Sequence, residues 1–280
     1  MKIGLVLEGG ALRGLYTAGV LDCFLKNNIQ VDGVYASSAG AMFGINYISK
    51  QQGRVLRFVK KLSSDKRYMG FKSYLTTGNI INKDYSYYKL PMYEDPFDEL
   101  TFQKNYIPFY ASLTNVETGQ AEYKEILNTQ KDVEYLRASS SMPFLSKIVK
   151  IKSKKYLDGG LADSIPLKIC KKNNYDKIIV ILTREEDHIE RKNNQLLTKI
   201  VYHKYPNLVK IINNRYKEYN SLITEINKLA ADKQIFLIRP SKHIEMKSLE
   251  RNNDKLQSMY DLGLNDANKL LNDLKKYISA

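Results

Sequence analysis

The amino-acid sequence predicts an α/β protein in which helices flank a mainly parallel central sheet. Three observations favour this fold class: short unbroken apolar runs, helical patterns that follow them, and two strand–turn–helix units within the first fifty residues. Strands that alternate with helices form parallel sheets, because each helix carries the chain back to the edge where the next strand begins. We expect residues 1–280 to form a single domain of this kind.

The first two units are the clearest. Ile3 to Leu7 is a continuous apolar run, typical of a strand that is covered on both faces, and it ends at a glycine pair. Val31 to Ser37 predicts a second strand, and Ala39 to Ile48 predicts the helix that follows it. The helix of the first unit is indicated by Leu15, Ala18, Leu21 and Leu25.

Residues 68–106 interrupt this alternation. The segment is rich in aromatic residues and is broken by Gly78, Pro91 and Pro96, so we expect an irregular insertion. Such an insertion is able to cover a lipid site, and ordinary packing of a loop-rich region explains it equally well.

The remaining elements follow the same periodicities. In chain order we expect a strand at 107–113, a hairpin partner at 121–123, a helix at 133–138, a strand at 177–182, a helix at 208–229, a strand at 235–238 and a helix at 259–277. The motifs described below lie within about 3–167, and a helix and strand part follows in 168–280.

The chain is strongly basic, with 44 Lys and Arg against 30 Asp and Glu and a formal charge of +14. Such a charge attracts anionic lipid headgroups or nucleic acid. An A/T-rich codon bias, indicated by abundant Lys, Asn, Ile and Tyr, explains much of it equally well. No nucleic-acid motif accompanies the charge, so we expect no nucleic-acid partner and allow peripheral contact with an anionic membrane.

Cys23 and Cys170 lie in apolar stretches and form no CxxC pair, which predicts buried reduced thiols and no zinc site. The first apolar run ends at Glu8, too early for a secretory signal. No window approaches the roughly 18 apolar residues of a membrane span. We therefore expect a soluble, cytoplasmic protein, and nothing predicts its oligomeric state.

Three segments carry candidate chemistry. The first is Ala36 to Gly40, where Ser38 stands between small residues after a strand and before a helix. A sharp turn of this kind, a nucleophile elbow, needs small neighbours because the strand and helix backbones approach closely. Ser37 is the competing serine, and the position of Gly40 two residues after Ser38 favours Ser38.

The second segment is a glycine-rich strand-to-helix turn, whose exposed N–H groups bind anions such as a nucleotide phosphate or an oxyanion. A dinucleotide site also needs an acidic residue at the end of the second strand, where serines stand, so the nucleotide interpretation is weaker. The turn consists of Gly9, Gly10, Ala11, Leu12, Arg13 and Gly14.

The third segment places Asp158 before Gly159 and Gly160, in a tight loop after a strand. A turn aspartate that bonds its own backbone is the alternative role for Asp158. Asp163, followed by Pro166, is expected to cap the start of a helix.

Together the three segments resemble the patatin-like phospholipase family, whose motifs are a GGGxRG loop, a GxSxG serine and a DGG or DGA aspartate in that order. The resemblance covers about residues 3–167. It implies a three-layer fold and a catalytic dyad of Ser38 and Asp158 without a catalytic histidine. The loop from Gly9 to Gly14 would then form the oxyanion hole, without a metal or organic cofactor.

The implied activity is hydrolysis of lipid carboxylic esters, as by a phospholipase A or lysophospholipase. An acyltransferase or thioesterase with the same dyad is the nearer alternative, and a non-catalytic lipid- or nucleotide-binding homologue is the more distant one. A triad that includes His188 is a further alternative, which needs more strands before the serine than fit here. Ala11 and Ala36 stand where the family motifs have glycine. Alanine tolerates a positive φ poorly. If either position requires a positive φ, we expect the alanine to strain or weaken the site.

Overall fold

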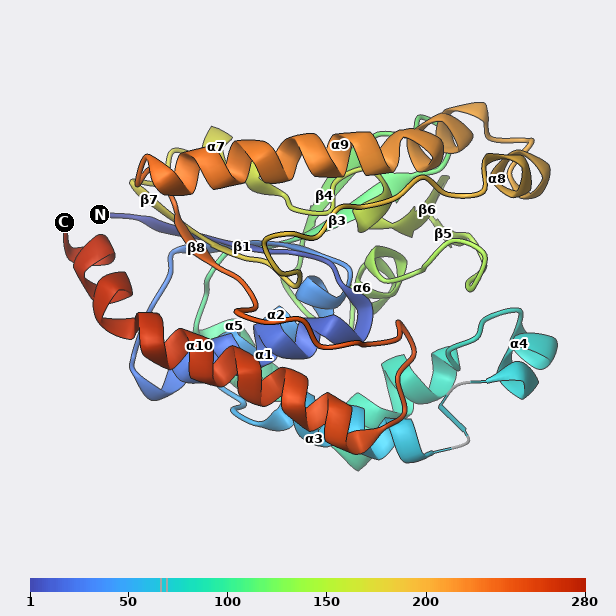
Figure 1. Ribbon diagram of the computed structural model, residues 1–280. Helices are drawn as coiled ribbons and strands as arrows, with labels where there is room; N and C mark the ends of the chain where they lie inside the picture. The colour runs from blue at the N-terminus through green and yellow to red at the C-terminus, as the bar shows by residue number, and fades with distance from the viewer. Residues whose placement is uncertain (66, 69) are drawn as a thin grey trace.

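The computed structural model describes residues 1–65, 67–68 and 70–280. In this part of the chain the strands form one sheet with the order β5-β6-β3-β2-β1-β7-β8, and β4 pairs with β3 off this path. Helices cover both faces of the sheet, so the molecule has three layers and the predicted fold class is confirmed (Figure 1).

The centre of the sheet is parallel. Its strands are β1 (Ile3–Leu7), β2 (Gly33–Ser37), β3 (Phe109–Asn115), β7 (Lys177–Ile181) and β8 (Phe236–Ile238). The pairs β1–β2, β1–β7, β2–β3 and β7–β8 all run parallel. The carboxyl ends of parallel strands meet at one edge, so the turns that follow β1 and β2 lie side by side.

The other strands run antiparallel. They are β4 (Ala121–Glu125), β5 (Val149–Ile151) and β6 (Lys154–Asp158). Ser112 of β3 pairs both with β4 and with Ser37 of β2, while Leu113 pairs both with β4 and with Asp158 of β6. Because β4 occupies one edge of β3, β2 and β6 share the other edge and meet end to end there.

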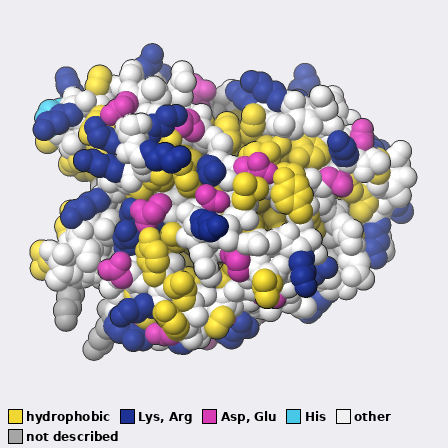
Figure 2. All heavy atoms as spheres, turned by 180° about the vertical axis from the view of Figure 1, so that it is seen from behind, with side chains coloured by type: hydrophobic (Ala, Val, Ile, Leu, Met, Phe, Trp, Pro, Cys, Tyr) yellow, Lys and Arg dark blue, Asp and Glu magenta, His cyan; other side chains and the backbone are white. Residues whose placement is uncertain are grey.

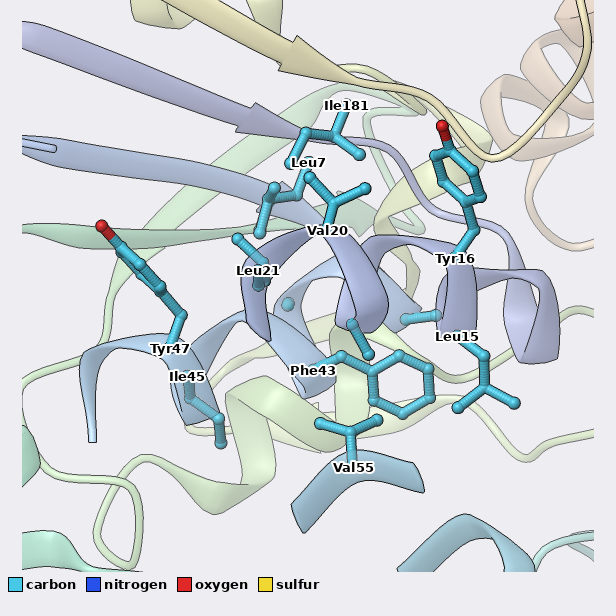
Figure 3. Close-up of a cluster of buried hydrophobic side chains, with 14 of the residues drawn as sticks. Leu7, Leu15, Tyr16, Val20, Leu21, Phe43, Ile45, Tyr47, Val55 and Ile181 are labelled. Atoms are coloured by element: carbon cyan, nitrogen blue, oxygen red, sulfur yellow. The ribbon is translucent and has the colours of Figure 1, made fainter. Parts of the chain in front are cut away.

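One face of the sheet packs against α1 (Leu15–Lys26), α2 (Ala39–Ile48), α3 (Arg54–Ser64) and α10 (Asn253–Ser279). Figure 3 shows Leu7 and Ile181 pointing from the strands toward Val20 of α1, and Phe43 of α2 lying against Val55 of α3. These side chains are buried, so the four helices and the sheet share one core.

Helix α10 crosses α1 at glycines. A Cβ at Gly19 of α1 would overlap the Tyr260 carbonyl, and one at Gly263 of α10 would overlap the Tyr16 carbonyl. The crossing therefore requires glycine at both positions, and it places the C-terminal helix directly against the first helix of the chain.

The opposite face packs against α7 (Leu167–Lys172) and α9 (Pro206–Ala231), which lie above the sheet in Figure 1. Val6 and Val180 point to this side and join a second buried cluster with Ile226 of α9. The short helix α8 (Gln195–Val201) precedes α9 at the right-hand end of the view.

The segment at 68–106 interrupts the strand–helix alternation as expected, but it is built largely of helical turns. These are α4 (Phe71–Thr77), the π-helix η2 (Asp84–Glu94) and α5 (Glu99–Lys104), while Met69 lies outside the described residues. Ion pairs hold the segment to α3, since Arg54 Nε lies 3.3 Å and Arg57 Nε 2.9 Å from the Asp95 carboxylate.

Most other expected elements are present, among them α6 (Val133–Ser139). The expectation for Asp163 was wrong: α7 begins at Leu167 without a side-chain cap, and the Asp163 carboxylate instead accepts a hydrogen bond from the Tyr123 hydroxyl at 2.6 Å. Both cysteines are buried and free, as predicted.

Candidate active site

Ser38 occupies the turn between β2 and α2 in a strained backbone conformation. Its φ of 50° and ψ of −119° lie outside the regions that L-residues ordinarily adopt. Strain of this size persists only where the surroundings hold it, and it is the conformation expected of a nucleophile elbow. A Cβ at Gly40 would lie 2.8 Å from the carbonyl oxygens of Leu7 and Glu8, which explains the glycine two residues after Ser38.

Asp158 lies at the end of β6, beside Ser38. The Ser38 hydroxyl donates a hydrogen bond of 2.6 Å to Asp158 Oδ2, although 120 positions separate the two residues in the chain. The other carboxylate oxygen, Oδ1, accepts the Gly160 amide at 2.8 Å. Both residues are nearly inaccessible to solvent, at 7% for Ser38 and 6% for Asp158.

Burial changes the acidity of this carboxyl group. Removal from water disfavours the charged form and raises the pKa of Asp158 to about 6. The hydrogen bonds from Ser38 and Gly160 and the positive charge of Arg215 act in the opposite direction and lower this pKa. Asp158 is therefore a stronger base than an exposed aspartate and still ionised at neutral pH.

A serine-rich segment after α6 supports both members of the pair. Ser139 Oγ accepts the Ser38 amide at 3.1 Å, and Ser140 Oγ donates to the Ser38 carbonyl at 3.3 Å. The Ser141 carbonyl accepts the Asp158 amide at 2.9 Å. The segment thus fixes the backbone on both sides of the 2.6 Å contact.

The glycine-rich turn follows β1, and its last four residues form the 3₁₀ helix η1 (Ala11–Gly14). The Gly9 amide donates to the Ser164 carbonyl and the Arg13 amide to the Gly10 carbonyl, both at 3.1 Å. In the part of the chain that the structure describes, the amides of Gly10, Ala11 and Leu12 have no acceptor. These three are the free donors of the turn.

The two alanines that replace family glycines differ in their backbone. Ala11 has a φ of 49°, in the left-handed region that favours glycine. Ala36 lies inside β2, fully buried, and has no positive φ. The strain expected from these replacements is therefore present at Ala11 and absent at Ala36.

Arg215 of α9 reaches the loop that carries Asp158. Its Nε donates to the Gly160 carbonyl at 2.8 Å and its Nη2 to Ser164 Oγ at 3.1 Å. Its Nη1 pairs with Glu190 Oε1 at 2.8 Å. All three guanidinium nitrogens are occupied, so Arg215 ties the aspartate loop to α9.

Tyr219, one helical turn after Arg215, reaches the other loop. Its hydroxyl donates to Glu8 Oε1 at 2.6 Å, and Glu8 Oε2 accepts the Thr183 hydroxyl at 3.0 Å. Glu8 is buried and directly precedes the glycine-rich turn. Residues four apart share one face of a helix, so the same face of α9 holds both loops.

Two cavities meet at Ser38. One, of about 150 Å³, is lined mainly by apolar side chains of α2, α3 and η2, among them Phe58 and Leu90. The other, of about 280 Å³, includes Asp158 and the polar side chains of Arg13, Asn193 and Arg215. Ser38 thus lines an apolar cavity on one side and a polar cavity on the other.

Arg13 forms no ion pair among the described residues, and its buried Nε has no hydrogen-bond partner there. Burial and the nearby charge of Arg184 lower its pKa. An unpaired guanidinium in a polar cavity beside Ser38 is a candidate binding group for an anion.

The alternative candidates lie elsewhere. Ser37 is fully buried in β2, with no hydrogen-bond partner for its hydroxyl in the described structure. His188 pairs with Glu190 at 3.2 Å, while the side chains bonded to Asp158 in the described residues do not include a histidine. The geometry therefore does not support the triad with His188.

The described residues contain no cluster of His, Cys, Asp or Glu suited to a metal ion. Among the helices described, none combines the length and the apolar character that a membrane crossing requires.

Fold and site together define a three-layer α/β protein in which a strained serine faces a buried aspartate beside a glycine-rich turn. Residues 5–171 match the family model described as patatin-like phospholipase. The chain belongs to this family. Residues 205–279, which include all of α9 and all of α10, match a domain of unknown function, DUF6363.

Curated relatives share the first part of the chain. The uncharacterized protein YjjU of Escherichia coli K12 is 29% identical over 189 residues, which are 65% of this chain and 52% of YjjU. Lysophospholipase NTE1 of Cryptococcus neoformans is 28% identical over 190 residues, or 64% of this chain and 11% of the relative. The chain thus spans about half of one relative and a small part of the other.

Lysophospholipase nte1 of Aspergillus niger is 27% identical over 189 residues, or 64% of this chain and 12% of the relative. Among solved structures, VipD of Legionella pneumophila aligns with a TM-score of 0.49 at 12% identity, over 97% of this chain and 67% of VipD.

Proposed function

We propose that this protein is a serine hydrolase of lipid carboxylic esters, similar to a phospholipase A or lysophospholipase. Ser38 is the nucleophile and Asp158 is the general base in this proposal. The observation that carries it is the 2.6 Å hydrogen bond from the Ser38 hydroxyl to the buried Asp158 carboxylate, at the junction of an apolar and a polar cavity.

The first half of the reaction acylates the serine. Ser38 Oγ attacks the ester carbonyl carbon while its proton moves to Asp158 Oδ2. The tetrahedral intermediate then breaks its bond to the alcohol, which leaves with the proton from Asp158. A carboxylate with a pKa of about 6 suits both steps at neutral pH, because it is ionised before attack and a usable acid afterwards.

The free amides of Gly10, Ala11 and Leu12 are the donors proposed for the oxyanion. Loss of one such donor typically lowers the rate by about 10²–10³. In the second half of the reaction, water attacks acyl-Ser38 and gives a proton to Asp158, and the bond to Ser38 Oγ then breaks as Asp158 returns that proton to Ser38 and the fatty acid is released. No metal or organic cofactor takes part in this scheme.

The two cavities support the choice of a lipid ester. The apolar cavity would receive the acyl chain, since burying apolar surface contributes about 25 cal/mol per Å². The polar cavity, with Arg13, would receive the headgroup side of the substrate. The lysophospholipase names of the NTE1 relatives point to the same substrate class.

An acyltransferase or thioesterase with the same dyad would use the same acyl-enzyme. Product analysis in the presence of an acceptor alcohol separates an acyltransferase from a hydrolase. A hydrolase still releases mainly free fatty acid, whereas an acyltransferase forms a new ester with the added alcohol.

The test of the proposed function is covalent labelling with a fluorophosphonate, combined with fatty-acid release from lysophosphatidylcholine. The wild type and Ser37→Ala should be labelled and active, and Ser38→Ala should be neither. An unlabelled wild type would favour the non-catalytic lipid-binding homologue.

The size of the apolar cavity predicts chain-length preference. An engineered apolar cavity of about 150 Å³ holds a molecule the size of benzene, so esters with short acyl chains should react fastest. Leu90→Ala removes a buried side chain of η2 from the lining and should shift the preference toward longer chains. An unchanged profile across a series of acyl lengths would contradict this assignment of the cavity.

A further inference from the structure

Helix α8 exposes an apolar face that no described residue covers. Leu196, Leu197, Ile200 and Val201 are 69%, 47%, 62% and 47% exposed, and Thr198 is the buried residue that anchors the helix. Isolated exposed aliphatic residues are common, but four of them within one seven-residue helix form a continuous apolar surface.

Basic residues border this apolar face. Residues 191–204 contain Arg191, Lys192, Lys199 and Lys204 and no acidic residue, and all four basic side chains are exposed. Figure 2 shows dark-blue basic and yellow hydrophobic side chains next to one another at the upper left, the end where α8 lies in this view. Apolar side chains framed by Lys and Arg are typical of helices that lie in the interface of an anionic membrane.

The α8 face adjoins the candidate active site. Asn193, two residues before α8, lines the polar cavity together with Ser38. At the other end of α8, the Tyr202 hydroxyl accepts the amide of Phe144 at 2.8 Å, and Phe144 lines the same cavity. A surface that binds α8 would therefore lie close to an entrance to the Ser38 site.

We propose that α8 docks this protein on an anionic phospholipid surface, with its four aliphatic side chains in the headgroup layer and the flanking basic residues on anionic headgroups. This docking role rests on the proposed function, because a lipid-ester hydrolase draws its substrate from such a surface. In this role, the basic residues next to α8 recognise the lipid surface that contains the substrate.

A second copy of the chain fits the same face less well. A symmetric dimer through α8 would bring the basic residues of both copies together, and like charges across an interface disfavour association. An anionic bilayer instead satisfies the apolar and the basic side chains together, because each basic residue near the surface is attracted to the anionic headgroups.

The test measures vesicle binding separately from catalysis. Ser38→Ala protein is sedimented with vesicles of phosphatidylcholine alone or of phosphatidylcholine and phosphatidylglycerol in equal parts. Binding should be at least about tenfold tighter to the anionic vesicles. Leu196→Ser with Ile200→Ser, in the Ser38→Ala background, should weaken this binding by about tenfold or more.

Matched variants control for general effects. Leu100→Ser with Leu127→Ser removes two exposed leucines from a surface outside α8 and should leave vesicle binding unchanged. Lys192→Gln with Lys199→Gln should weaken binding to the anionic vesicles alone. With Ser38 intact, all three double variants should hydrolyse a soluble short-chain ester at the wild-type rate.

Three outcomes overturn the docking role: equal binding to both kinds of vesicle, equal losses in the α8 and control leucine variants, or a dimer in sedimentation velocity that the α8 variant dissociates. The Ser38→Ala protein needs no turnover to bind. Vesicle binding without ester hydrolysis by the wild type would therefore refute the proposed function and leave the docking role standing.

Discussion

Residues 5–171 and residues 205–279 contribute to the same site in different ways. The first region supplies the Ser38–Asp158 pair and the glycine-rich turn. The second region supplies no member of the pair, but Arg215 holds the aspartate loop and Tyr219 holds Glu8 before the turn. The comparison teaches that the candidate catalytic groups lie in short loops, while the relative position of these loops also depends on a long helix far along the chain.

The largest effect should follow a change within the first region. Asp158→Asn removes the proposed base but keeps the size of the side chain, so kcat/KM on a short-chain ester should fall by about 10²–10⁴. Asp163→Asn is the matched control, because Asp163 lies five residues further along and bonds the Tyr123 hydroxyl instead. Equal losses in the two variants would show that the loop, and not the base, is what matters.

The wild-type pH profile tests the same residue. Only the carboxylate form of Asp158 accepts the serine proton, so kcat/KM should fall tenfold per pH unit as the pH drops below about 6. An acidic limb near pH 4, where an exposed aspartate titrates, would contradict the burial argument.

The next largest effect tests the second region. Arg215→Met frees the Gly160 carbonyl and Ser164 and should lower kcat by about 10–100-fold through misplacement of Asp158. Loss of the positive charge should also raise the pKa of Asp158 and move the acidic limb to higher pH. Arg215→Lys keeps the charge without the planar fork, so its rate should fall while its acidic limb stays in place.

Lys217→Met, on the exposed side of the same helix, controls for a general effect of losing a positive charge from α9. If Arg215→Met and Lys217→Met change kcat and the acidic limb alike, α9 has no positioning role and the comparison between the two regions fails.

A smaller effect is expected from Tyr219→Phe. The change leaves a buried oxygen of Glu8 without its donor and should lower the free energy of unfolding by about 1–3 kcal/mol. Tyr216→Phe, three residues earlier on α9, removes a hydroxyl without touching Glu8 and should have little effect in denaturant unfolding. A lower kcat in Tyr219→Phe would show that α9 positions the glycine-rich turn as well as the aspartate loop.

The smallest effect concerns the two alanines. Ala11→Gly relieves a left-handed backbone and should stabilise the protein by about 1 kcal/mol, whereas Ala36→Gly should destabilise it by about 0.5–1 kcal/mol because β2 gains a flexible residue. Paired unfolding curves measure both changes. If Ala11→Gly lowers the free energy of unfolding instead, the backbone at Ala11 is not strained.

The sequence predicted the fold class from local patterns, and it singled out Ser38, Asp158 and the glycine-rich turn as candidates because each stands in a motif of a few residues. The pairing of Ser38 with Asp158 was implied by the family resemblance. Arg215 and Tyr219 were missed for the opposite reason. Their partners Gly160 and Glu8 lie 55 and 211 positions away, and helical periodicity indicates only which face is buried. No local signal distinguishes a polar residue that reaches a loop from one that faces water.

The other differences have local causes. Gly78, Pro91 and Pro96 suggested loops at 68–106, but proline is compatible with the ends and irregular turns of short helices, including the π-helix η2. Helix α8 is only seven residues long, too short for a reliable periodicity. The role of Asp163 depended on Tyr123, 40 positions earlier, and so was also beyond local inference.

The end-to-end meeting of β2 and β6 on β3 has a consequence for how this protein tolerates change. Ser37, which directly precedes Ser38, is opposite Ser112, and Asp158 is opposite Leu113. Two consecutive residues of one strand therefore set the spacing between the Ser38 turn and Asp158. This spacing does not depend on the number of residues in the segment at 68–106. A one-residue slip of β6 along β3 would instead displace the carboxylate by about 3.3 Å and turn it to the opposite face of the sheet.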